Sequence, residues 1–341
     1  MSRRDDVYRR LAREIDKMPV PFTETASGVE LEILKHLFTP EEAEVALNLN
    51  ILPETLDRIH KRAKKNGITM TGEALEGMLD NLVAKGAITG GRSRRKGKLY
   101  GLAQLAVGIF EYQINRLTPG FVEDFERYVN EQFHKDLSQA KTQQMRTIPI
   151  SRSLTPELHV EPYNDIRAYV RNFKSDISVA NCVCRQSTDV TGGTCRHSDI
   201  RETCMQFGSA ARWCIEKGVG RAVTNEEALA ILDRAEEAGF ILQPQNAQAP
   251  KFLCCCCVDC CHALKVMNMH PRPAELFTSN YHVIVETSLC TGCAQCVGRC
   301  GMKAIGMSGD VAVVDLDRCV GCGVCTVACP TGALRLHRKN A

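Results

Sequence analysis

Two similar stretches near the end of the chain decide its fold: LCTGCAQCVGRCG at residues 289–301 and RCVGCGVCTVACP at residues 318–330. Each contains four cysteines in the pattern Cys-x2-Cys-x2-Cys-x3-Cys. The first run comprises Cys290, Cys293, Cys296 and Cys300, and the second comprises Cys319, Cys322, Cys325 and Cys329. Three thiolates at such short intervals fit one tight loop, so each stretch has the pattern of a metal-binding loop.

This spacing is typical of a protein that holds two [4Fe–4S] clusters, in which the fourth cysteine of each run binds the other cluster. We therefore assign one cluster to Cys290, Cys293, Cys296 and Cys329 and the other to Cys319, Cys322, Cys325 and Cys300. Gly292, Gly321 and Gly323 suit loops whose backbone must turn sharply close to inorganic sulfur. The alternatives are zinc, which more usually takes paired Cys-x2-Cys, and disulfides, which do not need this double register.

An internal repeat connects the two runs. A shift of 29 residues superimposes all four cysteines of the first run on the second, and Val285 on Val314. Residues 281–341 therefore resemble a bacterial-type ferredoxin with two [4Fe–4S] clusters. The resemblance implies two copies of a short strand, a cluster loop, a helical turn and a strand, and a module that passes single electrons. Gly301 stands where the family often has proline, whereas Pro330 retains it in the second half.

The composition is that of a soluble globular protein. A length of 341 residues suggests two or three domains, and 44% hydrophobic with 24% charged residues allows sizeable cores. The net charge of +3 indicates no particular partner. Residues 1–17 lack the apolar segment of a secretory signal, and no stretch is long and apolar enough to span a membrane. We expect a cytoplasmic protein, in which 19 cysteines indicate metal ligands or redox thiols.

The N-terminal third predicts a small helical domain. Helices are expected at residues 6–17, 29–38, 53–65 and 72–85, and another begins with a capping box at residues 39–42. A β-hairpin follows, with strands at residues 87–89 and 99–102. This order resembles a winged helix-turn-helix domain, with the basic loop at residues 90–98 as the wing.

A basic wing would meet phosphate, which indicates DNA binding. However, the helix that would enter the major groove carries Glu73, Glu76 and Asp80 against only Lys85. Such a helix repels a polyanion and lacks the usual base-reading side chains. DNA is therefore disfavoured, and the alternative is a protein-binding domain whose wing steers an acidic partner.

Two further helices are expected at residues 103–117 and 120–140. The second has Phe121, Phe125, Val129 and Phe133 at helical spacing, which is typical of a core or of a dimer interface. This helical arm is a candidate for homodimer formation. Residues 141–160 are polar and predict a linker.

A second group of cysteines lies upstream of the two runs. Residues 177–180 predict a strand that leads into Cys182 and Cys184, whose side chains share one face if the chain stays extended. Thr224 opens an amphipathic helix with a capping box. The candidate metal ligands are Cys182, Cys184, Cys195, Cys204, Cys254, Cys255, Cys256, Cys257, Cys260 and Cys261.

Three interpretations of this group remain open. The cysteines form a further iron–sulfur cluster, or hold structural zinc with His197 or His262 as an additional ligand, or form a thiol/disulfide redox centre. Arg185 and Arg196 lie next to candidate ligands, where positive charge would stabilise a thiolate or an anionic cluster. Neither a nucleotide-binding glycine motif nor a convincing Ser/His/Asp set is present.

We therefore expect an α+β multidomain protein. Its predicted parts are an N-terminal winged-helix-like domain at residues 1–104, a helical arm at 105–145, a cysteine-rich α/β redox domain at 146–280 and a two-cluster ferredoxin domain at 281–341. The predicted function is electron transfer as a subunit or partner of an anaerobic oxidoreductase complex, rather than as a stand-alone enzyme. The alternatives are a redox-sensing transcription regulator and a reductase that acts at the middle cysteines.

Overall fold

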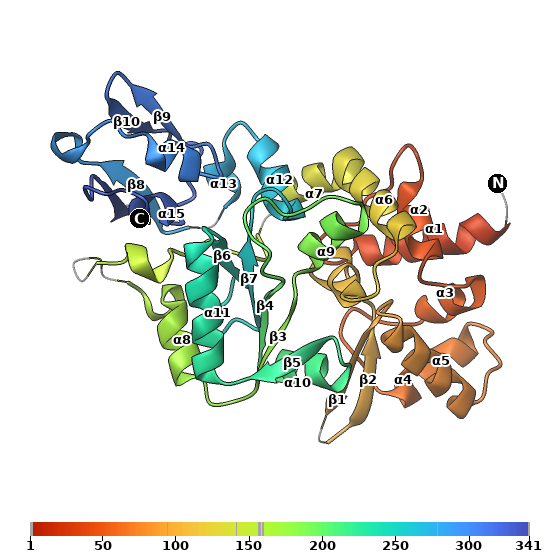
Figure 1. Cartoon of the computed structure of the whole chain (residues 1–341). Helices are drawn as coiled ribbons and strands as arrows, with labels where there is room; N and C mark the ends of the chain where they lie inside the picture. Colours follow the sequence, from red (N-terminus) through yellow and green to blue (C-terminus); the bar gives the residue numbers. More distant parts are fainter. Residues whose placement is uncertain are drawn as a thin grey trace. The chain divides into compact units, whose positions relative to one another are not determined.

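Two compact units make up the chain, Met1–Lys141 and Thr142–Ala341 (Figure 1). The computed structural model describes residues 3–93, 95–140, 142–155, 158, 160–277 and 279–339, without the side chains of residues 3–5 and 162. Within these ranges no helix is both long enough and apolar enough to cross a membrane.

The first unit begins with five helices and a hairpin. They are α1 (Arg3–Asp16), α2 (Val29–Lys35), α3 (Pro40–Ala46), α4 (Leu56–Lys65), α5 (Gly72–Ala84), β1 (Thr89–Ser93) and β2 (Gly97–Gly101). The predicted capping box at Thr39 is confirmed, since its hydroxyl accepts from the Glu42 amide while the Glu42 carboxylate accepts from the Thr39 amide. Thr71 caps α5 through the Ala74 amide.

The hairpin corrects one expectation, because most of the predicted loop at residues 90–98 is strand. The strands pair antiparallel from Thr89–Gly101 to Ser93–Gly97, and Arg94 lies outside the described residues. Lys98 on β2 forms ion pairs with Asp80 at 2.6 Å and Glu76 at 3.2 Å on α5. Two of the acidic groups expected to repel DNA therefore hold the hairpin against α5.

The prediction of a helix at residues 103–117 is wrong. Only short turns form there, η1 (Leu105–Ile109) and η2 (Glu111–Gln113), and residues 106–108 leave the helical range. Side chains replace helical hydrogen bonds here. The Gln104 side-chain amide donates to the Val107 carbonyl, and the Glu111 carboxylate accepts from the Gly108 backbone amide.

A helical segment follows as α6 (Pro119–Tyr128), η3 (Val129–Phe133) and α7 (His134–Gln139), where a helix was predicted. Its aromatic stripe is core: Phe121 and Phe125 are buried, and the Phe125 ring stacks on Phe110 at 3.9 Å between centroids.

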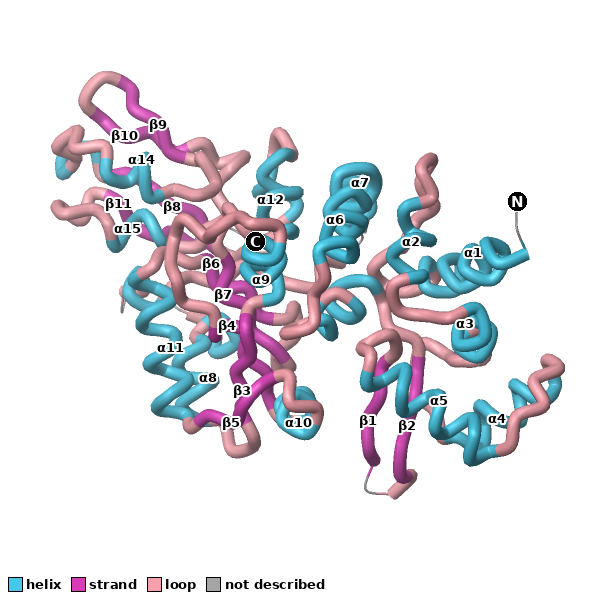
Figure 2. Tube along the Cα trace, turned by 45° about the vertical axis from the view of Figure 1, so that its right-hand side comes forward, coloured by secondary structure: helices cyan, strands magenta, loops and turns pink. Residues whose placement is uncertain are grey.

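The second unit is built on a five-stranded sheet in the order β5-β3-β4-β7-β6, antiparallel throughout (Figure 2). The strands are β3 (Ile177–Asn181), β4 (Glu202–Phe207), β5 (Gly220–Val223), β6 (Ile241–Pro244) and β7 (Phe252–Cys256). The helices beside it are α8 (Ile166–Asn172), α9 (Val183–Val190), α10 (Ser209–Glu216) and α11 (Asn225–Glu237). Among its described residues, the middle region thus combines helices with an antiparallel sheet.

Strand alternation gives the sheet two different faces. On one face Val179, Met205 and Leu253 join Ile231 and Leu232 of α11 in the main hydrophobic core. Alternate residues point to the opposite face, where Cys204 on β4 stands directly across from Cys254 on β7.

Two hydrophobic residues of the predicted linker belong to this unit's core. The short turn η4 (Ser151–Ser153) lies in this segment, and η5 (Pro162–Asn164) follows it. Ile148 and Ile150 are buried in the core, and the Ile148 amide donates to the Leu242 carbonyl of β6. The segment therefore extends the sheet edge.

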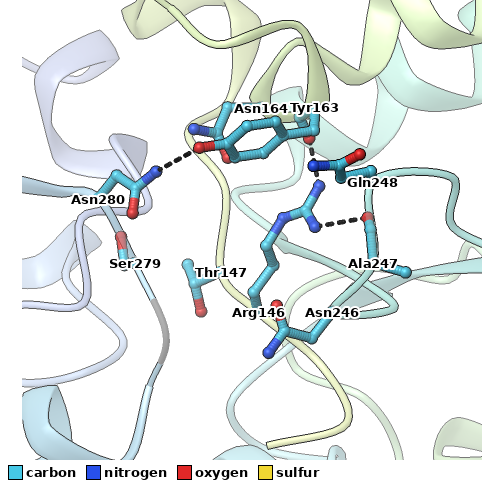
Figure 3. Close-up of a pocket in the computed structure, with 9 residues that line it drawn as sticks. All are labelled: Arg146, Thr147, Tyr163, Asn164, Asn246, Ala247, Gln248, Ser279 and Asn280. Atoms are coloured by element: carbon cyan, nitrogen blue, oxygen red, sulfur yellow. Dashed lines mark hydrogen bonds between the residues drawn. The ribbon is translucent and has the colours of Figure 1, made fainter.

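Arg146 joins this segment to two others (Figure 3). Its guanidinium donates to the Ala247 carbonyl at 2.7 Å and to the Tyr163 carbonyl, and stacks on the Tyr163 ring at 5.1 Å. These groups border a polar cavity of about 350 Å³, whose lining residues are Arg146, Thr147, Tyr163, Asn164, Asn246, Ala247, Gln248, Ser279 and Asn280.

The end of the chain shows the predicted internal repeat. After α12 (His262–Met269) and α13 (Pro273–Leu276), the elements are β8 (Tyr281–Val285), η6 (Thr287–Leu289), α14 (Gln295–Arg299), β9 (Ile305–Ser308), β10 (Val311–Val314), α15 (Val324–Val327) and β11 (Leu334–Arg338). β8 pairs with β11 and β9 pairs with β10, so the first and last strands close the module.

We predict that Arg146→Met lowers the free energy of unfolding by about 2–3 kcal/mol, because buried carbonyls lose their donors while the packing volume is kept. Anaerobic denaturant titration measures the change. Arg171→Met is the matched control, since Arg171 is exposed on α8. Equal stabilities of the two variants would contradict this role of Arg146.

Candidate metal centres

The structure brings together each set of four cysteines that was expected to share a cluster. Cys290, Cys293, Cys296 and Cys329 all line one small hollow in the C-terminal module. In the second set, burial and the neighbouring thiols of Cys300 and Cys319 raise the pKa of Cys322 to about 12. The fourth cysteine of each run therefore lies beside the other run. Ligation of iron by these eight thiols stays a prediction.

Backbone amides point at several of these sulfur atoms. The amides of Val283, Ala304 and Ala312 donate to the Sγ atoms of Cys319, Cys300 and Cys290 at 3.4, 3.3 and 3.5 Å. Hydrogen bonds to cluster sulfurs are among the features that set a cluster's reduction potential. Burial raises the pKa of Cys300, so its charged form needs a nearby positive charge such as iron.

Glycine is required in these loops where the backbone is left-handed and crowded. Gly321 has a φ of +64°, and a Cβ there would lie 2.1 Å from the Tyr281 carbonyl oxygen. Gly323 has a φ of +74°, and its counterpart in the first run is Ala294 with a φ of +54°. The first loop thus adopts the same backbone with a residue that tolerates it less well.

Six of the upstream cysteines form one group on the cysteine-bearing face of the sheet. Their positions come from five places in the chain: Cys182 precedes α9, Cys184 lies on α9, Cys204 lies on β4, Cys254 and Cys256 lie on β7, and Cys261 precedes α12. Their thiols interact in sequence along the group: Cys182 with Cys184, Cys184 with Cys261, Cys261 with Cys256, Cys256 with Cys254 and Cys254 with Cys204. We call this set the six-thiol group.

The expectation that Cys182 and Cys184 share a face of an extended segment is wrong. Cys182 is the last residue before α9, and Cys184 belongs to its first turn. The two thiols meet because the chain turns into a helix between them, and the Cys184 thiol and burial raise the pKa of Cys182.

A second, smaller group contains Cys195, Cys257 and Cys260 together with Asp259. Their four ligand atoms all lie within 4.8 Å of one another. The histidines considered as zinc ligands are not members of this group. His197 lies next to it, with Nε2 3.7 Å from Asp259 Oδ1, and burial lowers the pKa of His262 to about 3. The sequence analysis did not include Asp259 among the candidate ligands, although its position between Cys257 and Cys260 could have indicated it.

Cys255 belongs to neither group. It alternates with Cys254 and Cys256 on β7, so its side chain points into the hydrophobic core, where it is buried. The sequence analysis included Cys255 among the ligand candidates because it treated all cysteines of the run as equivalent candidates. Strand alternation makes them unequal.

Arg185 lies between the two groups and is fully buried. Its guanidinium donates to Thr203 Oγ1 at 2.6 Å and to the Cys255 carbonyl at 2.9 Å, and it stacks on the Phe240 ring at 4.1 Å. Across the described ranges it forms no ion pair with a carboxylate. Burial lowers its pKa, but the thiols of Cys182 and Cys257 reverse that effect, so its pKa lies above the usual value.

The other predicted arginine has a different place. The Arg196 side chain is exposed. Its backbone amide contributes to the smaller group, because this amide donates to Asp259 Oδ2 at 2.7 Å.

Comparison with known protein families identifies residues 312–335 as a 4Fe-4S binding domain. This segment contains the whole second run, from β10 to the start of β11. No curated protein and no solved structure matches the chain.

We predict that Gly321→Ala removes about four irons per chain, the content of one cluster. The added Cβ would meet the Tyr281 carbonyl and strain a left-handed residue next to Cys322. Gly298→Ala on α14 is the control, because a Cβ added at that position would have no neighbouring atom within 4 Å. Anaerobic iron and sulfide quantification measures the effect, and full iron content in Gly321→Ala would contradict it.

Proposed function

We propose that this iron–sulfur protein relays single electrons between two [4Fe–4S] clusters in residues 281–341 and a further iron–sulfur centre at the six-thiol group. The observation that carries the proposal is the exchange of fourth cysteines, with Cys329 beside the first run and Cys300 beside the second. Two interlocked cubanes require this arrangement. The second run matches a 4Fe-4S binding domain. The internal repeat supports cluster binding by the first run as well.

The buried charge of Arg185 supports a centre at the six-thiol group. A buried cation is unfavourable unless an opposite charge compensates it. The nearest candidates are thiols, including Cys182, Cys256 and Cys257. Thiolates bound to iron would supply the negative charge that neutral thiols do not.

Direct packing between the middle region and the C-terminal module supports electron exchange between them. Val258, which lies between Cys257 and Asp259 of the smaller group, packs on Gly301, where a Cβ would lie 2.6 Å from the valine side chain. Gly301 directly follows the cluster cysteine Cys300, and its carbonyl accepts from the Asn268 side chain of α12 at 3.2 Å. The glycine in place of the family's proline thus allows the cysteine loop to approach the second cluster.

Further contacts join the same regions. The Arg299 guanidinium donates to the Glu237 carbonyl at the end of α11 at 2.6 Å, and Arg318 donates to the Asn268 carbonyl at 3.1 Å. The Ile150 amide donates to the Cys322 carbonyl at 3.0 Å. A module held this way acts as a fixed arm of a larger redox protein, which favours a subunit or partner of an oxidoreductase complex over a free carrier.

We predict that the anaerobically purified chain contains about twelve or more irons with matching sulfide, of which about eight belong to the C-terminal module. In the double variant Cys182→Ser/Cys254→Ser the content falls to about eight, with the electron paramagnetic resonance signals of the two C-terminal clusters retained. Cys214→Ser is the matched control, since Cys214 is buried on α10 outside both groups.

Two results would overturn parts of this proposal. About eight irons in the wild type, unchanged in the double variant, would exclude the centre at the six-thiol group. About four irons would exclude the second C-terminal cluster.

A second candidate function is a redox-responsive transcription regulator whose winged-helix-like region binds DNA. The pairing of Lys98 with Glu76 and Asp80 favours it, because it neutralises part of the acidic face of α5 while Arg92, Arg95 and Lys96 stay exposed. Electrophoretic mobility shift with genomic fragments tests it. Binding that weakens with salt and with Arg92→Ser/Arg95→Ser is expected, and no binding in any cluster oxidation state would exclude it.

A further inference from the structure

We infer that Cys195, Cys257, Cys260 and Asp259 bind a single zinc ion, which is separate from the iron–sulfur centres. The inference starts from the compactness of the group. Among the described residues, this is the only set of three or more metal-ligating side chains whose ligand atoms all lie within 4.8 Å of one another. Neither the six-thiol group nor the cysteines of the two runs share this closeness.

The distances fit one ion rather than a cluster. Cys195 Sγ lies 3.6 Å from Cys257 Sγ and 3.8 Å from Asp259 Oδ1. Thiolates that share a tetrahedral zinc at about 2.3 Å stand roughly 3.8 Å apart. The thiolates of a cubane bind different irons and therefore stand farther apart. The spacing Cys257-x2-Cys260 is also the pair that structural zinc sites commonly use.

The carboxylate is oriented for this role. Asp259 has a side chain only 7% exposed, and the Arg196 amide holds its Oδ2 at 2.7 Å. This bond leaves Oδ1 facing Cys195 Sγ at 3.8 Å, with His197 Nε2 at 3.7 Å from the same oxygen. A ligand fixed by a neighbouring hydrogen bond has this kind of orientation. Three thiolates and a carboxylate would concentrate four negative charges, of which a divalent cation compensates two. Four protein ligands and no open position are typical of a structural zinc.

The position of the group indicates what such an ion would do. It would tie Cys195, in the segment between α9 and β4, to the loop at residues 257–260. That loop carries Val258 against Gly301 and continues into Cys261 of the six-thiol group. The zinc would therefore hold the loop through which the middle region meets the C-terminal module.

Metal analysis of the full chain purified anaerobically tests the inference. We expect about one zinc per chain beside the iron. In Cys195→Ser the zinc falls to a small fraction of that value while the iron content is unchanged, because Cys195 lies apart from the six-thiol group. Cys214→Ser keeps both metals. Zinc X-ray absorption of the wild type is expected to show three sulfur ligands and one oxygen ligand.

Three results would overturn the inference. No zinc in a chain with full iron would exclude the site, and so would a zinc shell without sulfur. Loss of iron with constant zinc in Cys195→Ser would assign Cys195 to a cluster. Missing iron with zinc retained in the wild type would instead count against the proposed electron-transfer centres, so the two failures are distinguishable.

Discussion

The middle of the protein depends on one buried positive charge. Arg185 lies on α9 against the Phe240 ring, and its described partners are a hydroxyl, a carbonyl and thiols. A guanidinium cannot lose its proton in such a place, so negative charge has to come to it. Cysteine thiols are the groups nearest to it, and a metal ion can stabilise several buried thiolates together.

Strand alternation then distributes the cysteines around this charge. Along β7, Cys254 and Cys256 face one side, while Cys255 faces the hydrophobic core. After the strand ends, the loop turns so that Cys257 and Cys260 join Cys195, and Cys261 returns to the first group. A run that looks uniform in the sequence is thereby divided into separate groups by the backbone geometry. The same loop brings Val258 against Gly301, which couples the division of the cysteines to the docking of the C-terminal module.

Local signals in the sequence predicted local structure well. Thr39 and Thr71 begin helices as expected, since capping involves only neighbouring residues. The segment at residues 103–117 failed because Gln104 and Glu111 bind backbone groups that a helix would have used. The segment around Ile148 was taken for a linker because its pairing partner, Leu242, is distant in the chain. The candidate site shows the same limit: Asp259 was missed, and Cys255 was included, since side-chain direction depends on the sheet.

The sequence by itself determined that this protein has a 4Fe-4S binding region, because three ligands of a cubane come from one short loop with fixed spacing. It also determined the repeat and hence which cysteines correspond. Only the tertiary structure decided how the upstream cysteines are grouped, since their neighbours come from strands and helices far apart in the chain. It also decided that Arg185 is buried and that Gly301 lies against Val258, because burial and close approach are properties of packing rather than of residue order.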